Sequence, residues 1–113
     1  MSKTKKPAFS DDDATALADL FRLLGDPSRL RIVVSCLRTP LAVTDIADKL
    51  GLSVSLVSHH LRLLKGARLV RADRQGKQVY YGINGRFETP THNSLHFGVE
   101  NYTIQVTTRD GAA

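Results

Sequence analysis

TDIADKLGLSVSLVSHHLRLL, from Thr44 to Leu64, reads as a helix, a tight turn and a second helix. Thr44 is a suitable N-cap, and Gly51 supplies the left-handed residue that ends the first helix. Ser53 can cap the second helix, in which apolar residues recur with helical spacing and form one core stripe. That stripe consists of Val54, Val57, Leu61 and Leu64. The stretch therefore predicts a helix-turn-helix.

The opposite face of the second helix is small and polar in its first half and cationic in its second half. It carries Ser55, Ser58, His59, Arg62 and Lys65. Short donors and acceptors suit base edges in a major groove, and cations suit phosphates. A solvated face without a ligand is the alternative reading. His60 points about 100° away from His59, so we expect it to pack or hydrogen-bond at the helix flank.

The charge of the 113-residue chain is concentrated in one region. The formal net charge is +5. Residues 59–78 hold six lysines and arginines against one aspartate, 6 − 1 = +5, so the remainder is balanced. Such a patch indicates an anionic partner. The single cysteine, Cys36, excludes an internal disulfide and is read as a core residue of a cytosolic protein. No membrane span, phosphate loop or nucleophile elbow is apparent, so we expect a cytoplasmic protein that is not an enzyme.

Two further helices are expected before the helix-turn-helix. Residues 1–9 are read as a disordered basic arm. Ser10 then caps a helix that ends at Gly25 and has three aspartates in its first turn. Its apolar stripe, widened by Leu20 and Leu23, comprises Ala14, Leu17, Ala18, Phe21 and Leu24. Asp26 and Pro27 begin a second helix that runs to Arg38, and residues 41–43 form one extended rung.

A β-hairpin is expected after the helix-turn-helix. Residues 69–83, LVRADRQGKQVYYGI, show two β-favouring runs around a turn at residues 73–77. A cationic hairpin that follows a recognition helix is placed to contact phosphates or the minor groove. Its predicted contacts are Arg74, Gln75, Lys77 and Gln78. Residues 10–84 are therefore expected to fold as a winged helix-turn-helix, a mainly α domain with a small β-hairpin.

The sequence resembles the ArsR/SmtB family of winged-helix repressors from about Leu17 to Ile83. The motifs that carry the resemblance are LGDPSRLRIV, VTDIADKLGLS, VSHHLRLLK and LVRADRQGKQVYYGI. It implies a dimer, built by the first and last helices, that represses from an imperfect palindrome and leaves it when an inducer, commonly a transition-metal ion, binds. The surplus apolar surface around Leu20 and Leu23 would then lie in the dimer interface. Two half-sites would lie about one DNA turn apart, roughly 34–36 Å.

The family's sensing sites are incomplete in this chain. Residues 42–44 offer no thiolate, and residues 84–87 lack the aspartate and histidine that open the site on the last helix. Residues 85–113 could instead form a dimerisation or sensing helix followed by a tail. A helix that starts at Thr89-Pro90 would place potential ligands for zinc, cobalt or nickel on one face. These ligands are His92, His96 and Glu100.

Several alternatives stay open for that segment and for the function. Residues 102–108 alternate like a strand, so the histidines are equally well read as surface or interface residues of a frayed tail. A repressor of this fold could answer a redox or small-molecule signal, or act without an inducer. A winged helix that dimerises without reading DNA is a further alternative, and the cationic recognition face and wing argue against it.

Overall fold

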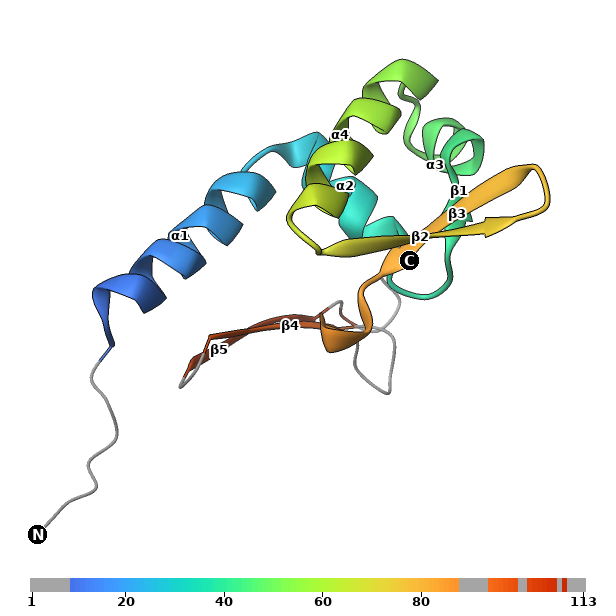
Figure 1. Ribbon diagram of the computed structural model, residues 1–113. Helices are drawn as coiled ribbons and strands as arrows, with labels where there is room; N and C mark the ends of the chain where they lie inside the picture. Colours follow the sequence, from blue (N-terminus) through green and yellow to red (C-terminus); the bar gives the residue numbers. More distant parts are fainter. Residues whose placement is uncertain (1–8, 88–93, 100–101, 108, 110–113) are drawn as a thin grey trace, which may run out of the picture.

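The computed structural model describes residues 9–87, 94–99, 102–107 and 109. Its helices are α1 (Asp11–Leu24), α2 (Pro27–Ser35), α3 (Val43–Leu50) and α4 (Val54–Gly66), with a 3-10 turn, η1, at Gly85–Phe87. Its strands are β1 (Leu41–Ala42), β2 (Val70–Gln75), β3 (Gln78–Ile83), β4 (Ser94–Val99) and β5 (Tyr102–Thr107). Figure 1 shows α2, α3 and α4 packed together, with the β2–β3 hairpin projecting on one side and α1 on the other. In the described part of the chain, no helix is long and apolar enough to cross a membrane.

The first two helices begin where the sequence predicts. Ser10 and Asp13 form a reciprocal capping box at the start of α1. The Asp26 side chain caps α2 by accepting from the Arg29 N–H at 3.0 Å, and Pro27 occupies the first turn. The predicted end of α2 at Arg38 is too late, because the helix ends at Ser35. The Cys36 N–H donates to the carbonyls of Ile32 and Val33, and the Leu37 N–H donates to the carbonyl of Val34.

The helix-turn-helix is confirmed, with two local corrections. Gly51 takes a left-handed conformation at φ 69°, and the Ser53 hydroxyl accepts from the Leu56 N–H at 3.1 Å. Thr44 is not the N-cap of α3. That position belongs to Ala42, because β1 pairs with β3 up to Ala42 and the chain turns directly into the helix. Val54 is not a core residue, since it begins α4 beyond the packed turns and is 48% exposed.

The wing is an antiparallel hairpin in a three-stranded sheet of order β1-β3-β2. Pairing runs without a break from Val70 opposite Ile83 to Gln75 opposite Gln78. The connection is therefore the two residues Gly76 and Lys77, shorter than the turn predicted over residues 73–77. Gly76 permits this turn because its φ is +65°. The first three residues of the predicted turn, 73–75, belong to β2 instead, since they pair with residues 78–80 of β3.

The C-terminal segment is a second hairpin where its residues are described, so the expected helix is wrong there. β4 and β5 pair antiparallel, with Leu95 opposite Val106 and Phe97 opposite Ile104. Leu95 and Phe97 are buried in the main core, and the Phe97 ring lies 5.6 Å from the Phe87 ring. The alternation of apolar and polar residues fits two strands with one buried face better than a helix.

The first helix packs on the core through a different side from the one expected. Leu17 is its only buried residue, and Leu20, Leu23 and Leu24 pack partly buried against the core. Leu20 and Leu23 are thus core-facing, in contrast to the interface role expected for them. The apolar residues that α1 leaves exposed are Ala16 and the three residues Ala14, Ala18 and Phe21, the last at 55%.

Candidate nucleic-acid interface

The recognition face of α4 is held outward by a buried inner face. Val57, Leu61 and Leu64 are 1% exposed or less and fix the helix against α2 and α3. Four of the predicted contact residues on the outer face are exposed, and Ser58 is half-buried. The exposed four are Ser55, His59, Arg62 and Lys65. The N-terminal half of α4 therefore presents small polar groups, and its C-terminal half presents cations.

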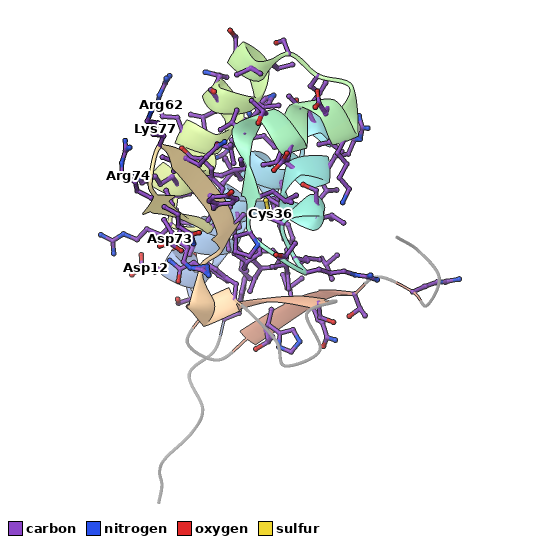
Figure 2. The ribbon with its side chains drawn as sticks, turned by 90° about the vertical axis from the view of Figure 1, so that its right-hand side faces the viewer. Asp12, Cys36, Arg62, Asp73, Arg74 and Lys77 are labelled. Atoms are coloured by element: carbon purple, nitrogen blue, oxygen red, sulfur yellow. The ribbon has the colours of Figure 1, made fainter. Side chains whose placement is uncertain are left out.

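The wing adds a second exposed cationic region. Lys77 lies in the turn, Gln75 and Gln78 are the last pair of the hairpin, and Arg74 belongs to the pair before it. All four are exposed. Arg74 makes only a long contact, 3.4 Å from its Nη1 to the Gly76 carbonyl. Figure 2 shows Arg62, Arg74 and Lys77 extending from the same side of the molecule. The fold thus places cations of α4 and of the wing on one side of the molecule, where Asp12 and Asp73 also lie (Figure 2); we call these cations the cationic surface.

Arg71 belongs to the basic run in sequence but has a structural role in the sheet. Its Nη1 donates to the Ile83 carbonyl at 3.0 Å, and its Nε lies 3.3 Å from Asp73 Oδ2. A Cβ at Gly82 would come within 2.9 Å of the same guanidinium, so glycine makes room for it. The positive charge of residues 59–78 is therefore not all available to a partner. Sequence reasoning did not distinguish Arg71 from the exposed cations, because the contacts of Arg71 depend on the register of β2 and β3.

His60 is a second residue whose role depends on tertiary structure. It is buried on the inner side of α4, and its Nε2 lies 3.7 Å from Asp26 Oδ2. The neighbouring His59 is exposed. The expectation that His60 packs at the helix flank is confirmed, whereas sequence reasoning did not find its partner on α2.

The described residues do not assemble a complete metal site. Among them no three histidines, cysteines or acidic residues come together. His96 lies on β4, opposite Gln105, and its Nε2 is buried without a hydrogen-bond partner in the described structure. His92 and Glu100 lie outside the described residues. The predicted helical spacing of the three ligands does not apply to a segment in which His96 belongs to a strand.

Cys36 is a core thiol, as the sequence predicts. It is 2% exposed, and burial raises its pKa to about 11. Figure 2 shows it inside the domain, away from the labelled cations. A protonated, covered thiol is a poor nucleophile and a poor metal ligand.

The recognition helix, the wing and their cationic surface define a winged helix-turn-helix protein. Residues 26–72 match the family described as bacterial regulatory protein, arsR family. The solution structure of the homodimeric winged helix-turn-helix DNA-binding domain of Mb0332 from Mycobacterium bovis, a possible ArsR-family transcriptional regulator, has a TM-score of 0.60 to this structure. It is 32% identical and covers 68% of this chain and 74% of that one. The chain belongs to the arsR family.

Two further relatives extend the comparison. The transcriptional repressor SmtB homolog of Synechocystis is 44% identical over 75 residues, which are 66% of this chain and 57% of the relative. The chain thus spans little more than half of that protein. The structure of the cadmium metal-sensor CMTR from Mycobacterium tuberculosis is 43% identical, with a TM-score of 0.53, and covers 59% of this chain and 70% of that one. These likenesses confirm the predicted family.

Proposed function

We propose that the chain is a cytoplasmic, homodimeric transcriptional repressor that binds an imperfect palindromic operator. The observation that carries this proposal is the shared orientation of the exposed cations of α4 and the wing (Figure 2). A helix with small polar residues in a major groove, beside a cationic hairpin on the adjacent backbone, combines base reading with phosphate binding.

The residue roles follow from position and chemistry. Ser55, Ser58 and His59 lie in the first half of α4 and are assigned to base edges. Arg62 and Lys65, one and two turns further along, are assigned to phosphates. The wing contacts are assigned to Arg74, Gln75, Lys77 and Gln78. Arg71 is left out of the contact set because its guanidinium is already engaged within the sheet.

A homodimer is supported by the poor packing of α1. This 14-residue helix has one buried side chain and three leucines that are only partly buried against the core, so it leaves apolar surface uncovered. Its exposed Ala14, Ala18 and Phe21 lie on neighbouring turns and form a stripe that a second copy would cover. The related Mb0332 domain is homodimeric. Two copies would also supply the two recognition helices that a palindrome requires.

We assign the inducer to the class of transition-metal ions, with zinc, cobalt and nickel as candidates. One structural relative is a cadmium metal-sensor, which supports a metal as the signal. His96 supports the C-terminal hairpin as its location, because a buried imidazole nitrogen without a hydrogen-bond partner in the described structure is a potential ligand. The remaining ligands would come from outside the described residues, with His92 and Glu100 as candidates. A redox signal through Cys36 is disfavoured by its burial and raised pKa.

The test is fluorescence anisotropy of the purified protein on DNA from its own upstream region. Zinc, cobalt, nickel and cadmium would be titrated at fixed salt against the wild type, His96→Ala and the double variant His92→Ala/His96→Ala. Gln105→Ala, which changes the cross-strand neighbour of His96 on exposed β5, is the matched control. We expect a metal to release the wild type and the control but neither histidine variant.

Two other outcomes would contradict parts of the proposal. Tight, sequence-selective binding that ignores all four metals would leave the repressor but reject the metal inducer. Binding without preference for any sequence over competitor DNA would reject the repressor and favour the dimerisation module.

A further inference from the structure

Two consecutive histidines of α4 occupy opposite environments. His59 is exposed on the recognition face, whereas His60 is 6% exposed and faces α2. Their ring centroids are 5.7 Å apart and the rings are tilted by 54°. Because both side chains leave the same helical turn, any rotation of α4 that moves His60 also moves His59 and Ser58.

The contact made by His60 joins α4 to the beginning of α2. Its Nε2 lies 3.7 Å from Oδ2 of Asp26, the oxygen that also accepts from the Arg29 N–H at 3.0 Å. Asp26 is therefore the N-cap of α2 and, among the residues that the structure describes, the acidic group that lies beside His60. At 3.7 Å the pair is an electrostatic contact longer than a hydrogen bond, and a small shift of α4 would tighten or break it.

An apolar side chain would be a simpler choice for this position if packing were its only role. The Nδ1 of His60 is buried and has no hydrogen-bond partner in the described structure. A buried polar atom without a partner destabilises the fold. The His60 imidazole therefore lowers the stability of the fold through its unpartnered Nδ1, while its Nε2 contacts Asp26.

We infer that His60 is a positioning residue for operator recognition. Its contact with Asp26 fixes the position and orientation in which α4 packs against α2. This inference rests on the proposed function and deepens it. His60 is buried and is not part of the exposed recognition face. It acts through the orientation of Ser58 and His59, so its loss should reduce the preference for operator over random DNA and leave the phosphate-driven binding in place.

Protonation of His60 would disturb the same contact. Burial lowers the pKa of His60, Asp26 on α2 raises it, and Arg29 on α2 and His59 on α4 lower it further. The imidazole is therefore neutral at pH 7.5. At acidic pH it gains a charge that attracts Asp26 and resists burial, which shifts α4 from the arrangement that reads bases. Sequence preference should then decline as the solution becomes acidic.

The experiment compares operator with random DNA by anisotropy, from pH 7.5 to 5.5, for the wild type and three variants. His60→Phe keeps an aromatic ring and removes the polar contact. His60→Gln keeps an N–H donor without a proton that titrates. Asp26→Ser keeps a capping oxygen for Arg29 and removes the charge.

We expect His60→Phe and Asp26→Ser each to lose about tenfold in preference at pH 7.5, and the double variant to lose no more than either alone. His60→Gln should restore most of the preference and lose less of it in acid than the wild type does. All variants should bind random DNA as the wild type does. Additive losses, or a His60→Phe variant with unchanged preference and pH profile, would overturn the inference. A wild type without any sequence preference would instead reject the proposed function, a result that these variants do not mimic.

Discussion

Arg74 and Arg71 provide a matched test of which wing charges contact DNA. They lie three residues apart on β2, and replacing either by glutamine removes one positive charge. Arg74 is exposed with one long contact, whereas Arg71 is tied to Ile83 and Asp73. We expect Arg74→Gln to change the salt dependence of DNA binding and Arg71→Gln to leave it unchanged.

The magnitude follows from counterion release. Each neutralised phosphate adds about 0.9 to the slope of log affinity against log salt. In a dimer on two half-sites, one residue counts twice, so Arg74→Gln should reduce the slope by about 1.8. A fourfold rise in salt would then weaken the wild type about tenfold more than Arg74→Gln. The triple change Arg62→Gln/Arg74→Gln/Lys77→Gln should reduce the slope by about 5.

The assay is operator affinity from anisotropy at four or more salt concentrations between 50 and 200 mM, a range over which phosphate contacts are well resolved. Chemical denaturation of each variant provides the second readout. Arg71→Gln should lower the free energy of unfolding by about 1 kcal/mol, because its hydrogen bond to the Ile83 carbonyl is lost. Equal slopes for the two single variants would refute the assignment and show that the wing acts only through its total charge.

Three further predictions address stability and assembly. Burial lowers the pKa of His60, and the hydrogen bond from the Arg29 N–H lowers the pKa of Asp26. On acidification, the unfolded chain therefore binds more protons than the folded chain. The free energy of unfolding should therefore fall as the pH drops below about 6.5, because of His60, and again near 3.8, because of Asp26. Urea titrations should show the first decrease for the wild type and a smaller one for His60→Phe. Phe21→Glu should shift the dimer to monomer in sedimentation equilibrium, whereas Phe9→Glu, outside the α1 stripe, should have little effect; an unchanged dimer would place the interface elsewhere. Arg68→Gly should raise the free energy of unfolding by about 1 kcal/mol, since Arg68 is a non-glycine residue at φ 62°, and Arg68→Ala, which keeps the strain, should give no such gain in thermal melts.

The parts of the fold that depend on neighbouring residues in sequence were predictable. Ser10, Asp26 and Ser53 cap their helices as expected, and Gly51 ends α3, because a capping oxygen or a left-handed residue acts within a few positions. Spacing also identified the inner face of α4 and the strands of the wing. The cationic surface follows from these elements because its side chains leave the outer face of α4 and the tip of a hairpin.

Apart from the end of α2, the errors concern features that depend on residues distant in sequence. The length of the wing turn depends on how far the pairing of β2 and β3 extends. The orientation of α1 depends on which face of that helix packs against the core. For the C-terminal segment, the possible cap and the histidine spacing indicate a helix, whereas the alternation over residues 102–108 indicates a strand. In the structure, Leu95 and Phe97 lie on one face of strand β4 and are buried in the core. The Asp26–His60 and Arg71–Ile83 contacts join positions far apart in sequence, and neither leaves a local pattern.

If a second copy covers the exposed stripe of α1, as we propose, the concentration of the chain in the cell sets how strongly it represses. A helix whose exposed apolar stripe is covered only by a second copy becomes more stable as the chain becomes more concentrated. Below the dimer dissociation constant, the dimer population varies with the square of chain concentration, so halving the chain lowers the operator-binding species about fourfold. Dilution during cell growth would then relieve repression sharply, with no ligand required.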